Sequence, residues 1–339
     1  MKLLCSTVLF FTLIQSSVAT VVLNDKDLST LDLKEIRSVA PQLSPDRIEL
    51  SDHPTRGTSI QSFLSKNGQL QKIVELPFAE NINCNGSSIT LNAELRKDGY
   101  FQIKSRKNYF VHAQVTCGKI NKLIFESASD AGQAIGIWNI ASLALQKFLQ
   151  INRDAFWKKS ITINWPASGD YYSFNTVNIT RGDYWDVVGH ELGHAIYDQA
   201  NIGSFGGGSH KIDECYSQAL ALSEGWASFF SAWISIDLND PDAKFEFMVP
   251  RRAPLRIETI PSDVCPGEKN EWRVTGFFWD LIDLHQDDED LNESFQLLWD
   301  KTLNKKAKTT NEIAANLISL GLPQAHINEA WELNFLITR

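Results

Sequence analysis

Cysteine is scarce in this sequence, with 5 among 339 residues. Cys5 lies in an apolar N-terminal segment that we expect to be removed, so that Cys84, Cys117, Cys215 and Cys265 remain. None of these four has C-x-x-C spacing, which disfavours a zinc site built from cysteines. An even number of cysteines in a secreted chain instead indicates two disulfides. The pairing of Cys84 with Cys117 and of Cys215 with Cys265 is one of three possible arrangements.

Positive charge is also in deficit, because 32 Lys and Arg residues face 41 Asp and Glu residues and give a net charge of -9. This balance disfavours nucleic acids and anionic membrane surfaces as partners. After the N-terminus, no stretch approaches the roughly 18 apolar residues of a membrane-spanning helix, so we expect no stable membrane insertion.

The first residues have the layout of a secretory signal. Lys2 is followed by the apolar stretch Leu3–Ile14, and Ser17-Val18-Ala19 fits the small-x-small rule for cleavage. We therefore predict a signal peptide over residues 1–19 and a secreted or periplasmic protein. The alternative is an N-terminal membrane anchor, for which the apolar stretch is short.

Histidine is rare as well, yet two of the 7 histidines flank a glutamate in His190-Glu191-Leu192-Gly193-His194. An α-helix turns once in about 3.6 residues, so His190 and His194 project from one face and can hold one Zn²⁺. Glu191 lies beside them, where it could take a proton from a metal-bound water. The alternative is an ordinary amphipathic helix with two hydrogen-bonded histidines. A glutamate buried on such a helix would cost free energy without a metal or a partner, which favours the zinc site.

The third ligand distinguishes the classes of zinc peptidase. The metzincin pattern needs a glycine at position 197 and a histidine at position 200, where this chain has Tyr197 and Ala200. Residues 217–234 instead predict a helix that is almost wholly apolar or small, with Glu224 as the one acid at its centre. A carboxylate inside such a helix needs a counter-charge, which a metal supplies. The alternatives are an exposed helix acid at Glu224, or Asp213 and Glu214 as competing ligands.

This arrangement resembles the gluzincin group of zinc metallopeptidases, which includes the thermolysin-like and fungalysin-like enzymes. The resemblance extends over roughly residues 130–339 in architecture and over only a short motif in sequence. It implies that His190, His194 and Glu224 bind zinc and that Glu191 is the general base in peptide-bond hydrolysis.

One position departs from the gluzincin pattern. Many gluzincins carry an aspartate four residues after the ligand glutamate, where it braces a ligand histidine, and this chain has Ser228 there. We therefore expect that contact to come from Asp198, Asp186 or a backbone carbonyl.

Catalysis also needs a group that stabilises the charge on the carbonyl oxygen of the substrate. His210 ends a glycine-rich loop between the two zinc helices, and Arg273 lies in a later aromatic helix with Asp280 as a partner that could brace it. We predict that His210 and Arg273 are catalytic residues, with Tyr216 as a further donor. The alternatives are a solvent-exposed histidine and a structural Arg273–Asp280 ion pair.

The pattern of strands and helices predicts an α+β fold. Residues from about 70 to 125 alternate in short stretches, which indicates a small antiparallel β-sandwich of about five strands within an N-terminal accessory or pro-domain over residues 20–126. Lys97-Asp98-Gly99 marks a hairpin turn in it. Residues 127–339 predict a mostly helical, zincin-like catalytic domain with a small edge sheet, in which the strand 173–180 would bind an extended peptide as an added strand.

These observations together predict a secreted zinc metallopeptidase that acts on a peptide or protein substrate. Two other functions are compatible with the same residues. One is a secreted binding module on a peptidase scaffold that no longer turns over substrate, and the other is a zinc hydrolase of a non-peptide substrate.

Overall fold

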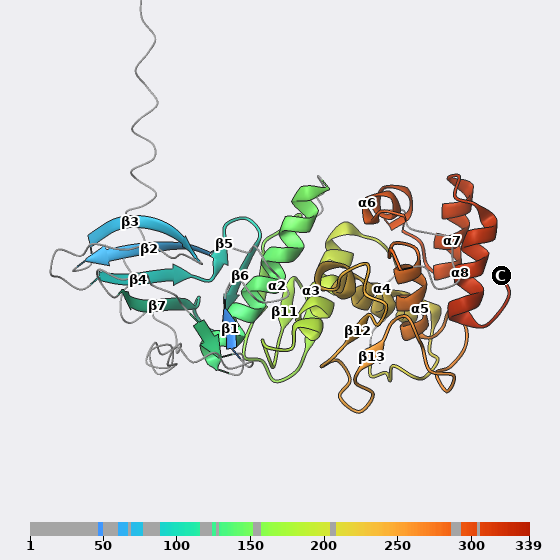
Figure 1. Cartoon of the computed structure of the whole chain (residues 1–339), viewed down its shortest axis with the longest axis horizontal. Helices are drawn as coiled ribbons and strands as arrows, with labels where there is room; N and C mark the ends of the chain where they lie inside the picture. Colours follow the sequence, from blue (N-terminus) through green and yellow to red (C-terminus); the bar gives the residue numbers. More distant parts are fainter. Residues whose placement is uncertain are drawn as a thin grey trace, which may run out of the picture.

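The computed structural model describes residues 47–49, 60–66, 69–76, 89–115, 124–126, 129–151, 157–203, 208–285, 293–303 and 306–339. The chain is elongated, with a strand-rich end, a helical end, and helices α2 and α3 between them (Figure 1). The α+β class is confirmed. Residues 1–19, Cys84 and Cys117 lie outside the described part, so the signal peptide and the Cys84–Cys117 disulfide stay predictions.

The strand-rich end is a four-stranded antiparallel sheet in the order β3-β2-β4-β7. Its strands are β2 (Ile60–Lys66), β3 (Gln69–Leu76), β4 (Ile89–Glu94) and β7 (Phe110–Val115). Next to it, β1 (Arg47–Glu49) pairs with β8 (Ile124–Glu126) in a separate two-stranded sheet.

The prediction that the N-terminal strands form one sandwich is wrong for the described residues, because two of these strands belong to another sheet. Strand β5 (Arg96–Lys97) and strand β6 (Phe101–Lys104) are joined by the predicted turn, in which Gly99 has φ +82°. Strand β6 then pairs in parallel with β9 (Ile161–Asn164), far along the chain. The reason is packing: Phe101 is fully buried and lies with its ring 5.0 Å from that of Trp138 on α2.

The resulting five-stranded sheet has the order β10-β11-β9-β6-β5. Strand β11 (Thr176–Asn178) pairs with β9 on one side and with β10 (Tyr171–Ser173) on the other. The prediction of 173–180 as the free edge is therefore wrong, and the edge on this side is β10. Phe174 and Asn175 form the turn between β10 and β11, and both have positive φ, as a two-residue hairpin of type I′ requires.

Polar caps explain where most of the helices begin. The side chain of the residue before the helix accepts a backbone N–H at α2 (Asp130–Gln150), α4 (Gln218–Ser235), α5 (Glu271–Asp280), α6 (Phe295–Leu298) and α7 (Thr310–Ser319). The other elements are α3 (Trp185–Ala200), the π-helix η2 (Trp299–Leu303), α8 (Gln324–Phe335), β12 (Lys244–Phe245) and β13 (Leu255–Arg256). None of the described helices combines the length and the apolar character needed to cross a bilayer.

Helices α3 and α4 touch at glycine. A Cβ added at Gly193 would lie 2.9 Å from both the Cα and the carbonyl oxygen of Ala227, and a Cβ at Gly189 would lie 2.3 Å from Ser231 Oγ. These two glycines therefore allow α4 to approach α3 closely. The contact determines how far α4 stands from the histidines of α3.

Gly193→Ala should push α3 and α4 apart, because the added methyl group meets backbone atoms that cannot rotate away. We expect the free energy of unfolding to fall by about 1–3 kcal/mol, the usual cost of overpacking, in urea unfolding of the metal-free chain. Gly169→Ala is the matched control, since its Cβ would lie 3.7 Å from the nearest atom. Equal unfolding free energies for the two variants would contradict the close helix contact.

Candidate metal centre and active site

Helix α3 presents two imidazoles and a carboxylate on one side. His190 and His194 are one turn apart, and their Nε2 atoms lie 3.1 Å from each other. His194 and Glu191 are both 7% exposed. The predicted spacing therefore brings the two imidazoles to one point.

Helix α4 brings the third group to the same point. Every residue of α4 from Leu220 to Ile234 is buried, as expected for a helix that is apolar on all sides. Glu224 is in the middle of this buried stretch, and its Oε2 lies 3.2 Å from His190 Nε2 and 3.0 Å from His194 Nε2. The structure thus unites the three predicted ligands.

The donor set fits zinc. Two ligand atoms at about 2.0–2.1 Å from a tetrahedral Zn²⁺ are roughly 3.3 Å apart, close to the 3.0–3.2 Å that separate these three atoms. Two imidazole nitrogens and one carboxylate oxygen are also a usual set for a catalytic zinc, with a position left open. Burial raises the pKa of Glu224, but the charges and hydrogen bonds of His194 and His190 outweigh burial and hold that pKa well below its usual value. The carboxylate form that binds a cation is therefore the favoured one.

Ser228 braces one of the histidines. Its Oγ lies 3.0 Å from His190 Nδ1, the ring nitrogen that points away from His194 and Glu224. The expectation that Asp198, Asp186 or a backbone carbonyl makes this contact is wrong for His190. Ser228 stands one helical turn after Glu224, so the position at which many gluzincins carry an aspartate keeps its contact with a shorter side chain.

The two aspartates have other partners. Asp198 accepts a hydrogen bond of 2.6 Å from the Tyr172 hydroxyl on β10. Asp186 is fully buried, and its Oδ2 accepts the backbone N–H groups of Glu246, Phe247 and Met248 at 2.7, 2.7 and 3.2 Å. Asp186 thereby ties the segment after β12 to the start of α3.

Glu191 has the environment of a base rather than of a structural acid. Its Oε2 is buried and has no hydrogen-bond partner within the described part of the chain. Burial raises the pKa of Glu191 to about 7, and the charge of His190 opposes this shift only in part. A carboxyl group with such a pKa can accept and return a proton near neutral pH.

The three groups open into a cleft of about 550 Å³. Tyr171 and Tyr172 of the edge strand β10 form one wall, and residues 247–250 form another. Four lining residues are acids, namely Asp170, Glu191, Glu224 and Glu271, and no lysine or arginine is among the lining residues in the described part of the chain. The cleft is therefore acidic apart from its three histidines.

His210 lies at the site as predicted. Its Nε2 is 3.7 Å from Glu224 Oε2 and 3.2 Å from Glu271 Oε2, and its Nδ1 is 2.9 Å from the Gly208 carbonyl oxygen. Glu271 is the functional candidate that the sequence analysis missed. It is the first residue of α5 and 7% exposed, and burial together with the charge of Glu224 raises its pKa well above the usual range. An acid at a helix N-terminus is common in sequences, so only the fold reveals this one.

Arg273 is not at the site, and the prediction of a catalytic role for it is wrong. Its side chain is buried, and its Nε, Nη1 and Nη2 donate to the carbonyl oxygens of Cys265, Asn334 and Val264 at 2.9, 2.6 and 2.9 Å. Arg273 thus joins α5 to the segment before it and to α8. Tyr216 also has other partners, since its hydroxyl donates to Glu214 and accepts from the backbone N–H of Lys211.

The two competing acids are also engaged elsewhere. Asp213 Oδ2 pairs with Arg252 Nη2 at 2.8 Å, and Glu214 pairs with Lys211. Neither acid lines the cleft.

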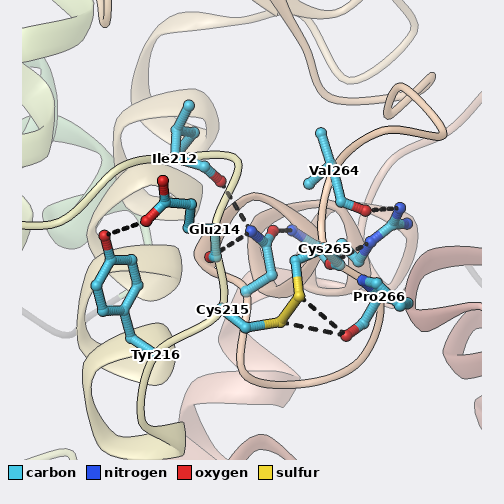
Figure 2. Close-up of a disulfide and its surroundings, with 9 residues drawn as sticks. Ile212, Glu214, Cys215, Tyr216, Val264, Cys265 and Pro266 are labelled. Atoms are coloured by element: carbon cyan, nitrogen blue, oxygen red, sulfur yellow. Dashed lines mark hydrogen bonds between the residues drawn. A yellow bond between two sulfur atoms is a disulfide. The ribbon is translucent and has the colours of Figure 1, made fainter.

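A disulfide fastens the loop between α3 and α4 to the segment that precedes α5. Cys215 and Cys265 are bonded, with Cα atoms 5.6 Å apart, and this bond belongs to one of the three arrangements that the sequence left open. Figure 2 shows the bond beside Ile212 and Glu214, whose carbonyl oxygens accept from Asn270 Nδ2 at 2.8 and 2.9 Å. The Asn270 side chain also caps α5, so the segment that follows His210 and the helix that carries Glu271 are held together.

Comparison with known families identifies one matching family. A family described as the mycolysin C-terminal domain matches residues 152–327, about half of the chain. The matched residues include His190, His194 and Glu224, and the match points to the mycolysin- and thermolysin-like peptidases. A search of the curated proteins found no match.

Ser228→Ala should lower the affinity for zinc by about 10–100-fold, because it removes the hydroxyl that orients the His190 ring. Competition with a chromogenic chelator measures this affinity. Ser235→Ala is the matched control on the same helix, since the Ser235 hydroxyl has no hydrogen-bond partner among the described residues. A Ser228→Ala chain that binds zinc as tightly as the control would remove Ser228 from the site.

Proposed function

This chain belongs to the mycolysin C-terminal domain family, and we propose on that basis that it is a secreted zinc metallopeptidase that hydrolyses peptide bonds. The observation that carries the proposal is the convergence of His190 Nε2, His194 Nε2 and Glu224 Oε2 beside the buried carboxyl group of Glu191. Residues 20–126 would be an accessory or pro-domain, and residues 127–339 the catalytic domain.

His190, His194 and Glu224 would hold the zinc ion. A zinc ion bound there supplies a Lewis acid that polarises a carbonyl group and makes a water molecule acidic near neutral pH. Ser228 keeps the His190 ring in the orientation in which Nε2, rather than Nδ1, faces the other two ligands.

Glu191 acts as the general base and then as the general acid. Its raised pKa lets it take a proton from the attacking water and return that proton to the departing amine. Its neighbours in the cleft, His190 and Glu224, place it next to the atoms that react. His210 lies on the other side of Glu224, and we assign it to the region where the carbonyl oxygen of the substrate gains charge.

Strand β10 provides the means to hold an extended substrate. It is the edge of its sheet, and Tyr171 and Tyr172 line the cleft from it. A peptide that adds to β10 as a further strand would run along the cleft past Glu191 and Glu224. This geometry favours a peptide or an unfolded protein segment as the substrate.

Digestion of a peptide library by the full chain, with and without a metal chelator, tests the proposed activity. We expect cleavage that the chelator abolishes and that added Zn²⁺ restores, because the attacking water depends on the metal. Cleavage that persists in the chelated protein would contradict a metallopeptidase. If the zinc-loaded chain turned over only esters or other non-peptide substrates, the protein would be a zinc hydrolase that does not act on peptide bonds.

Glu191→Gln should keep zinc bound and lower kcat by about 10²–10⁴-fold, the range for the loss of general acid–base catalysis. Metal analysis of the same preparation is the control, because the amide leaves His190, His194 and Glu224 in place. Full activity of the zinc-loaded variant would show that Glu191 takes no part in the reaction.

The rate should fall in acid as Glu191 becomes protonated, because only its carboxylate accepts the proton of water. Burial raises the pKa of Glu191 from 4.5 to about 7, and the charge of a bound zinc ion pulls this pKa down again. We therefore expect the acidic limb of kcat/KM to lie between these two values for a neutral peptide substrate. A limb below pH 4.5 would contradict a buried base.

A further inference from the structure

A second group of potential metal ligands lies next to the first. His210, Glu224 and Glu271 offer three ligand atoms that all lie within 4.8 Å of one another. This group shares only Glu224 with the group of His190, His194 and Glu224. The three residues come from the loop before α4, from α4 itself and from the start of α5, so only the fold brings them together.

The hydrogen bond of His210 determines what its other nitrogen presents. The Gly208 carbonyl oxygen can only accept, so His210 Nδ1, at 2.9 Å, carries a proton and donates it. In the neutral imidazole, Nε2 then presents its lone pair toward Glu271 Oε2 at 3.2 Å and Glu224 Oε2 at 3.7 Å. Either a proton or a metal cation among these three converging atoms would relieve their mutual repulsion. A histidine whose second nitrogen donates to a backbone carbonyl is also the usual form of a metal ligand.

The charge of the cleft supports the same reading. Its four acids are Asp170, Glu191, Glu224 and Glu271, and none of the described residues that line it is a lysine or an arginine. Glu224 and Glu271 are 6% and 7% exposed, so water screens their charges poorly and a bound cation would stabilise them strongly.

The framework around this group is held in place independently of any metal. The Asn270 side chain donates to the carbonyl oxygens of Ile212 and Glu214 and caps the helix that begins at Glu271. The disulfide between Cys215 and Cys265 fastens the same two segments (Figure 2). His210 and Glu271 are thus brought together by contacts that need no ion.

We propose that His210, Glu224 and Glu271 bind a second divalent cation, with Glu224 as the carboxylate that bridges it to the zinc held by His190 and His194. Imidazole and carboxylate ligands suit zinc and the neighbouring transition metals. The proposal rests on the proposed function in that Glu224 serves both sites. The proposal also gives His210 a role at the carbonyl oxygen of the substrate. His210 would hold a cation near that oxygen instead of donating a proton to it, as ligands do in two-metal peptidases.

Zinc counting on the full chain tests this proposal. The chelator-treated protein is dialysed against buffered Zn²⁺, and bound zinc per chain is measured by atomic absorption. We expect about two zinc ions per chain, as in a two-metal site. Glu271→Gln and His210→Gln should each lose one of the two ions and keep the other. Glu214→Gln is the matched control, because Glu214 is a nearby acid outside the cleft, and it should keep both ions.

A Co²⁺ titration followed by visible absorption provides a second measurement. The unchanged chain should show two successive spectral changes, and the Glu271→Gln chain only the first. Thermal unfolding of the metal-free variants shows whether each variant is folded. If Glu271→Gln does not fold, His210→Gln replaces it in this test.

The outcomes separate the second site from the first. A single zinc in the unchanged chain that His194→Gln removes and Glu271→Gln leaves in place would overturn the second site and keep the proposed function. A zinc content that His194→Gln does not lower would overturn the proposed function itself. Loss of zinc in Glu214→Gln equal to that in Glu271→Gln would also overturn the second site, because the effect would then be one of overall charge.

Discussion

The close contact between α3 and α4 is the constraint on which the candidate metal centre depends. Gly189 and Gly193 let the backbone of α4 approach until a single Cβ would no longer fit. That approach places a carboxylate from the middle of a buried apolar helix within 3.2 Å of two imidazoles. A buried carboxylate without partners is costly, so the helix contact and the metal site stabilise each other. Separation of the helices would remove the two imidazoles that compensate the charge of Glu224.

Buried polar side chains position the remaining walls of the cleft. Asp186 uses its carboxylate to hold three successive backbone N–H groups of residues 246–248, and this segment continues into the lining residues 247–250. The guanidinium group of Arg273 instead donates hydrogen bonds to three backbone carbonyl oxygens around α5. Such side chains satisfy backbone groups that would otherwise be buried without partners. A buried charge in this protein is therefore as often a structural tie as a catalytic group, and only its partners tell the two apart.

Burial and charge divide the acids of the site into different roles. Burial alone would raise the pKa of each of them, yet Glu224 faces two imidazoles and keeps its charge, whereas Glu191 and Glu271 have weaker compensation and raised pKa values. In the proposed function, the same residue type would thus supply a ligand at one position and a proton acceptor at another. This difference follows from the neighbours that the fold supplies and not from the identity of the side chain.

Local spacing was enough to predict the pair His190 and His194, the base Glu191 between them, the hairpin at Gly99, and the burial of the helix around Glu224. Each of these follows from the periodicity of one element and from the cost of burying a charge. The α+β class and the bond between Cys215 and Cys265 could also be predicted, the latter as one of several pairings. The pairing of strands could not be predicted from the sequence. Strand β6 pairs with β9, which is distant in sequence, because Phe101 of β6 packs on α2.

The contacts of several polar residues could not be predicted from the sequence either. Arg273, Glu271, Asp186 and Ser228 contact groups in segments that are distant along the chain. The sequence by itself determined which side chains one turn of helix presents. The tertiary structure decided which distant groups meet them, because long-range packing and buried hydrogen bonds depend on all the segments at once.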